Sequence, residues 1–275
     1  MTNEWPKKEN KELVSEKENI AQALEEIAET KIFDPEYLEN ISLVVFSMEE
    51  EDKSMELFKN GHTKTVGGTD YNSQDFMQGR RTDFIGINTK RDFAELDPEA
   101  LSDRQILLFL FVEGKLSYEE FVAHEIAHNL FDKEYKVKHG EFEDDNGITN
   151  VSQEYLDIIS SRLEELVARY YPSLDMGRFN IQRQKIAEIF AMIHEREFCR
   201  RSNINFNIHI DTKQKVKEFF SNPEEILIEF NKKHSKDCKL EDIYEENHIL
   251  SLIITPLLEE EYPKFEDRKN FFWKK

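Results

Sequence analysis

Apolar residues recur at helical spacing through most of the chain. One such stripe predicts a charged helix over residues 12–30, which ends near Asp34-Pro35. The same spacing predicts further helices over residues 102–112, 117–133, 152–171, 181–199, 213–220 and 241–258, with a restart at Asn222-Pro223 and a kink or stop at Pro256. The pattern therefore indicates a mostly helical protein.

Two stretches have the composition of strands. Residues 41–48 (ISLVVFSM) are a β-rich apolar run of strand length, and residues 83–89 form the clearest strand within a glycine-containing region. Residues 203–211 alternate and predict a short strand or an extended loop. The predicted fold class is α+β, mostly α, with a small mixed sheet and an all-helical C-terminal part.

This pattern also suggests how the chain is divided. We expect a helical extension over residues 1–40, a strand-containing subdomain over residues 41–134, and a helical subdomain over residues 135–275. Residues 134–150 are charged and contain two glycines, so they predict an exposed loop at the second boundary. A site would then lie between the second and third parts.

The helix predicted over residues 117–133 contains an HExxH motif, formed by His124, Glu125 and His128. Residues four apart lie on one face of an α-helix, so both imidazoles can reach one Zn²⁺ with Glu125 beside it. Ser117 and Glu120 form the S-x-x-E pattern of a capping box, which supports a helix start here. The alternative is two surface histidines on an ordinary amphipathic helix.

Catalytic zinc usually has three protein ligands and an open position for water, whose pKa it lowers to about 7. Glu125 would take the proton of that water. A third ligand directly after the motif is excluded, because the HExxHxxGxxH pattern needs Gly and His where Phe131 and Glu134 stand. The ligand should therefore come from a later helix.

Several later glutamates could supply this ligand. Glu188 is preferred because Ala187 and Ala191 would let its helix approach closely, whereas Glu195 is the main competitor and should matter much less when replaced. The other candidates in helical context are Glu154, Glu164, Glu165 and Glu197.

Two segments, VAHEIAHNLFD at 122–132 and AEIFAMIH at 187–194, resemble elements of the catalytic domain of anthrax lethal factor and related gluzincin metallopeptidases. This resemblance implies a zincin-like fold with an active-site helix, zinc ligands His124, His128 and Glu188, and Glu125 as general base. The chain departs from that family at Met192, where the family has an acidic residue, in the longer separation of the motifs, and in having no matching tyrosine.

Two further carboxylates are candidates to support the site. Asp132 and Glu120 each lie four residues from a motif histidine and could hold its second ring nitrogen, or could be solvated helix charges. A surface or packing role is expected for the remaining histidines, which are His62, His139, His194, His209, His234 and His248.

The composition of the chain limits the kinds of partner that we expect. A net charge of −20 disfavours nucleic acid as a partner. Two cysteines, Cys199 and Cys238, suit a reducing compartment, no apolar signal core is present near residue 1, and the longest apolar runs are too short to cross a bilayer. We expect a cytosolic protein without a membrane or nucleic-acid partner, acting on a peptide or protein substrate; its oligomeric state stays open.

The motif, its helix and the candidate third ligand predict a zinc-dependent metallopeptidase that hydrolyses peptide bonds with a glutamate general base. Two rivals from other classes remain open. One is a catalytically inactive zincin-fold protein with a binding or regulatory role, and the other is a helical interaction protein that binds no metal.

Overall fold

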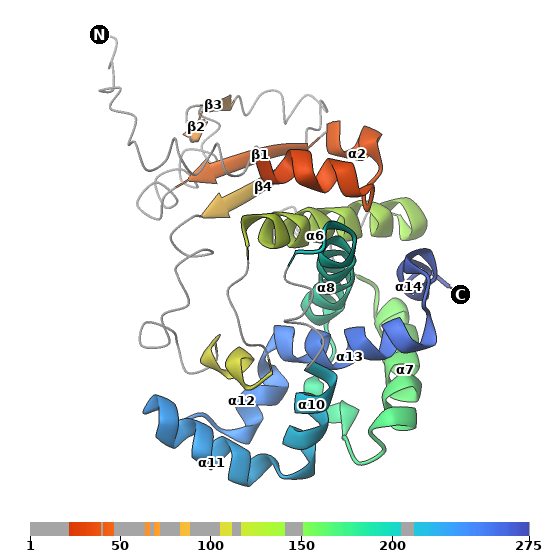
Figure 1. Ribbon diagram of the computed structural model, residues 1–275. Helices are drawn as coiled ribbons and strands as arrows, with labels where there is room; N and C mark the ends of the chain where they lie inside the picture. The colour runs from red at the N-terminus through yellow and green to blue at the C-terminus, as the bar shows by residue number, and fades with distance from the viewer. Residues whose placement is uncertain are drawn as a thin grey trace. The chain divides into compact units, whose positions relative to one another are not determined.

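The computed structural model describes residues 22–39, 41–46, 64–66, 69–71, 83–88, 105–111, 117–140, 151–204 and 212–274 (Figure 1). The chain divides into two compact units, residues 1–95 and residues 96–275. The boundary expected near residue 134 falls inside a helix of the second unit. Among the described residues, no helix is both long and apolar enough to cross a membrane.

The first unit contains helical and extended segments. A helix over residues 22–30 is followed by α2 (Pro35–Glu39), whose first turn is capped by Asp34 Oδ1 accepting from the Glu36 backbone amide at 2.9 Å. Strands β1 (Ile41–Phe46) and β4 (Asp83–Asn88) pair in parallel, whereas β2 (Lys64–Val66) and β3 (Thr69–Tyr71) pair antiparallel. Two strands thus lie where the sequence predicts them, at residues 41–48 and 83–89.

The predicted α+β class with a small mixed sheet is nevertheless wrong. Where both backbone and side chains are described, 80% of residues are helical and none is in a strand, so this part of the chain is all-helical. The backbone of the described strands forms one parallel pair and one antiparallel pair, and neither pair is mixed. Local composition can indicate an extended segment, but the number of strands that pair depends on long-range packing.

The second unit is built from helices. Their bounds are η1 (Gln105–Leu110), α6 (Tyr118–His139), α7 (Gln153–Tyr170), η2 (Met176–Phe179), α8 (Arg183–Ser202), α10 (Thr212–Ser221), α11 (Pro223–His234), α12 (Leu240–Glu245), α13 (Asn247–Glu261) and α14 (Phe265–Phe271).

Three local predictions need correction. The segment after residue 134 is not a loop up to residue 139, because α6 continues to His139 and ends at Gly140, whose φ of 89° is disfavoured for residues with a Cβ. Residues 105–110 form a 3₁₀-helix, and of the kink or stop expected at Pro256 the stop is wrong, because Pro256 lies within α13. Most of the segment 203–211, from residue 205 on, is outside the described residues.

Helix α8 lies between α6 and α13 (Figure 1) and every residue from Lys185 to Cys199 is buried. A helix surrounded by protein normally carries apolar side chains, yet this one also carries charged residues in its buried stretch. Three of them are paired with groups near the C-terminal end of the chain: Lys185 Nζ with the Tyr244 carbonyl oxygen at 2.7 Å, Arg196 with Glu259 at 2.7 Å, and Glu197 with Arg268 at 2.8 Å. The other two, Glu188 and Glu195, face histidines.

Candidate metal centre

The start of α6 positions the HExxH motif. Ser117 Oγ accepts a hydrogen bond from the Glu120 backbone amide at 3.2 Å, and Glu120 Oε2 accepts one from the Ser117 amide at 2.6 Å, so the predicted capping box is present. The second carboxylate oxygen of Glu120 accepts from Cys199 Sγ at 3.1 Å. Glu120 therefore caps α6 and joins it to α8, which differs from its predicted role beside a motif imidazole.

Asp132, the other carboxylate predicted to hold a motif imidazole, accepts from Arg183 Nη2. Arg183 is the first residue of α8, so this ion pair again links α6 to α8. The two helices are thus joined on both sides of the motif, through Glu120 and through Asp132. This arrangement holds the motif residues at a set position along α8.

The two motif histidines lie one helical turn apart, and their Nε2 atoms are 3.0 Å from each other. The His124 side chain is 9% exposed and that of His128 is 29% exposed, so one ring is enclosed while the other reaches solvent. Two imidazole nitrogens at this separation repel each other unless a proton or a cation lies between them.

The carboxylate of Glu188, on α8, faces both of these nitrogen atoms. Its Oε1 lies 3.0 Å from His124 Nε2, and its Oε2 lies 3.3 Å from His128 Nε2. The three residues predicted as metal ligands are therefore brought together by the packing of α8 against α6. Ala187 and Ala191, which were expected to permit a close approach, are both buried.

Glu195 is placed on the far side of the His124 ring. Its Oε2 lies 2.8 Å from His124 Nδ1, the nitrogen opposite the one that faces Glu188. Ligating histidines usually donate their second N–H to such a carboxylate, which sets the tautomer and the ring orientation. The competitor for the third ligand thus occupies a supporting position. Three further candidates are exposed on α7, namely Glu154, Glu164 and Glu165.

Glu125 lies beside the same cluster. Its carboxylate has an oxygen within 4.8 Å of ring nitrogens of both His124 and His128, and its side chain is half-buried. It is therefore near the two imidazoles without standing between them and Glu188.

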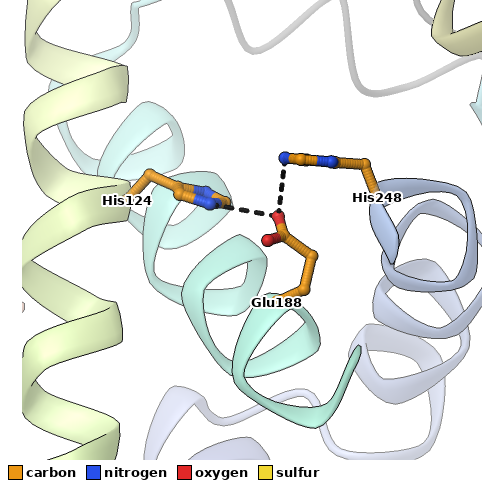
Figure 2. Close-up of side chains that lie close together, drawn as sticks. All are labelled: His124, Glu188 and His248. Atoms are coloured by element: carbon orange, nitrogen blue, oxygen red, sulfur yellow. Dashed lines mark ion pairs between the residues drawn. The ribbon is translucent and has the colours of Figure 1, made fainter. Parts of the chain in front are cut away.

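A third histidine enters the site from α13, and sequence reasoning missed it. His248 Nε2 lies 3.3 Å from Glu188 Oε1, and Figure 2 shows His248 and His124 directed at the same carboxylate from opposite sides. Only a surface or packing role was predicted for His248, so its contact with Glu188 was not anticipated. The residue is 60 positions beyond Glu188 in the sequence, so no local spacing could have linked the two.

The electrostatics favour positive charge within the cluster. Burial opposes protonation of His124, but the adjacent Glu188 and Glu195 carboxylates together outweigh it and raise the pKa of His124 well above its usual value. Burial likewise opposes ionisation of Glu188, yet His248 and His124 hold the pKa of that carboxyl well below its ordinary range. Glu188 Oε1 is buried and accepts no hydrogen bond of good geometry from the described residues.

These donor atoms suit a metal ion. Imidazole nitrogens and a carboxylate oxygen are ligands that Zn²⁺ accepts, and a cation would satisfy the buried Glu188 oxygen. No family model matches the chain, and no similar curated protein or solved structure was found. The function is therefore inferred from the geometry of the site itself.

Proposed function

We propose that the protein is a zinc-dependent metallopeptidase of the gluzincin type, with His124, His128 and Glu188 as zinc ligands and Glu125 as general base. The observation that carries this proposal is the position of Glu188. It comes from a separate helix, yet its carboxylate lies 3.0 Å and 3.3 Å from the Nε2 atoms of the two motif histidines.

The proposed reaction is hydrolysis of a peptide bond. Bound zinc would polarise the substrate carbonyl and lower the pKa of water to about 7. Glu125 then takes a proton from the attacking water and delivers it to the departing amine. Glu195 faces Nδ1 of His124, which would orient the ring and leave Nε2 of the neutral imidazole free to hold the ion.

The substrate class follows from the same chemistry. A peptide or protein chain presents the carbonyl and the leaving amine that this arrangement of residues can act on. A net charge of −20 makes a phosphate-rich partner improbable. We place the protein in the cytosol, since both of its cysteines are buried free thiols, as expected where disulfides do not persist.

The test combines metal analysis with one variant. Purified protein should contain about one zinc ion per chain and should cleave peptides in a broad library. Glu125→Gln should retain that zinc and lose at least about a hundredfold in turnover, the usual scale of a general-base contribution. Absence of zinc after reconstitution, or full activity in the variant, would contradict the proposal.

One further result would decide between classes of function. If the wild-type protein binds zinc tightly but cleaves nothing in the library, the inactive zincin-fold alternative with a binding role replaces the peptidase. A protein that binds no metal at all would instead match the helical interaction protein.

A further inference from the structure

His248 lies in the first turn of α13, outside the HExxH motif and outside α8. Its Nε2 is 3.3 Å from Glu188 Oε1, and the same oxygen lies 3.0 Å from His124 Nε2. One carboxylate oxygen is thus faced by imidazole nitrogens from two different helices (Figure 2). The ligand atoms of these three residues all lie within 4.8 Å of one another.

His248 is oriented in the same manner as His124. Glu246 Oε1 lies 3.0 Å from His248 Nδ1, just as Glu195 Oε2 lies 2.8 Å from His124 Nδ1. A neutral imidazole whose Nδ1–H donates to a carboxylate carries its lone pair on Nε2, as a metal ligand must. The two rings are also nearly parallel, with an interplanar angle of 16°. Both residues therefore present Nε2 to Glu188 while a carboxylate holds the opposite nitrogen.

The separations of His124 and His248 from Glu188 are close to those of ligands around one metal. With bonds of 2.0–2.1 Å, two ligand atoms on a tetrahedral zinc ion are separated by about 3.3–3.4 Å. The distance from His248 Nε2 to Glu188 Oε1, at 3.3 Å, equals that from His128 Nε2 to Glu188 Oε2. By distance alone, His248 is as close to Glu188 as a motif histidine is.

We propose that His248 is a fourth protein ligand of the metal, beside His124, His128 and Glu188. The inference rests on the metal centre of the proposed function and adds a level of regulation to it. Four protein ligands fill a tetrahedral shell, whereas a catalytic zinc site keeps one position open. Water or a substrate carbonyl would then reach a bound ion only if His248 left its place or the shell expanded.

His248 is the ligand best placed to leave. Its side chain is 44% exposed, against 9% for His124 and 7% for Glu188. It also stands one residue after the start of α13, where Glu246 separates α12 from α13. A substrate entering from solvent would therefore meet His248 before it meets the two enclosed ligands.

The experiment compares metal binding by the wild type with binding by His248→Ala and by His234→Ala. Zinc affinity is measured by competition with a chromogenic chelator, and coordination by the visible spectrum of the Co²⁺-loaded proteins. Loss of a ligand should weaken zinc binding at least about tenfold, since even residues behind the ligands contribute about 10–100-fold. The His248→Ala spectrum should also lose intensity as water enters. His234, on α11, is the matched control and should change neither result.

A replacement that keeps a donor atom separates coordination from packing. His248→Cys should recover part of the lost zinc affinity and add a sulfur-to-cobalt charge-transfer band, which arises only when the new thiolate binds the metal. Zinc affinity within twofold of the wild type in His248→Ala, with an unchanged cobalt spectrum, would overturn the inference and leave the three-ligand site intact. A wild type that binds no metal would overturn the proposed function as well.

Discussion

The Oε2 atom of Glu195 lies 2.8 Å from His124 Nδ1, on the side of the ring opposite Glu188. Sequence reasoning assigned Glu195 little influence, but this contact sets which nitrogen of His124 carries the proton. We expect Glu195→Gln to weaken zinc binding by about 10–100-fold, the usual cost of losing such a support. Chelator competition measures the effect, and Glu165→Gln on the exposed face of α7 is the control. Equal affinity in both variants would contradict the supporting role.

Glu188 is expected to be needed for metal binding and for the stability that the metal provides. Zinc at a hundredfold excess over its Kd should stabilise the wild type by about 2.7 kcal/mol, and Glu188→Ala should lose most of that gain. Thermal unfolding with and without zinc measures the difference. Glu164→Ala, which alters an exposed candidate ligand, should respond to zinc as the wild type does. A zinc response retained in Glu188→Ala would remove Glu188 from the ligand set.

Removing the buried ion pair between Glu197 and Arg268 is expected to lower the stability of the protein strongly. Arg268 is 4% exposed, and its Nη2 donates to Glu197 Oε2 at 2.8 Å. Removing one partner of a buried pair costs about 3–5 kcal/mol, so Arg268→Ala should lower the free energy of unfolding by about this much. Arg200 and Arg201 still contact Glu197, which favours the lower end of that range. Denaturant unfolding gives the value.

The control for this variant is a surface pair of the same chemistry. Arg169 Nη1 lies 3.1 Å from Glu261 Oε2 with its side chain 53% exposed. Arg169→Ala should change the free energy of unfolding by no more than about 1 kcal/mol. Similar losses in the two variants would show that burial does not govern the energetics of these pairs.

The buried imidazole of His194 is expected to make the folded state less stable in acid. Burial lowers the pKa of this imidazole to about 3, and its Nδ1 donates to the Phe190 carbonyl oxygen at 2.9 Å. The unfolded chain takes up a proton near pH 6.5, whereas the folded chain does so only near pH 3. Stability is therefore full above pH 6.5 and falls between those values by up to about 1.4 kcal/mol per pH unit.

The variant that tests this is His194→Gln, which cannot titrate. Its free energy of unfolding should depend less steeply on pH than that of the wild type between pH 6.5 and pH 4. Unfolding in urea at several pH values gives both slopes. Parallel slopes would show that His194 is not responsible for the acid sensitivity.

Local features of the sequence predicted part of the site. The capping box at Ser117 and Glu120 sets the start of α6, and the four-residue spacing of His124 and His128 places both rings on one side. Glu188 could be proposed because a third ligand had to come from a later helix, and small neighbours favoured this position. Each of these steps depends on residues close in the chain.

The features that sequence reasoning missed depend on long-range packing. Nothing in its own helix indicates that His248 will meet Glu188, since the meeting follows from how α13 packs against α8. The position of Glu195 behind His124 likewise depends on the register of α8 against α6. The prediction of the fold class was wrong for a related reason. The apolar runs at 41–48 and 83–89 predicted extended segments, but they could not predict how many strands would pair.

The burial of α8 has a consequence for how the protein is made. Lys185, Arg196 and Glu197 have partners at Tyr244, Glu259 and Arg268, all beyond residue 240. During synthesis these charges emerge from the ribosome before their partners exist, and burying them then would be costly. A nascent chain, or one truncated near residue 240, therefore lacks these three partners of the buried charges on α8. Because Glu188 is carried on the same helix, we expect the site to assemble only after residues 244–268 have been synthesised.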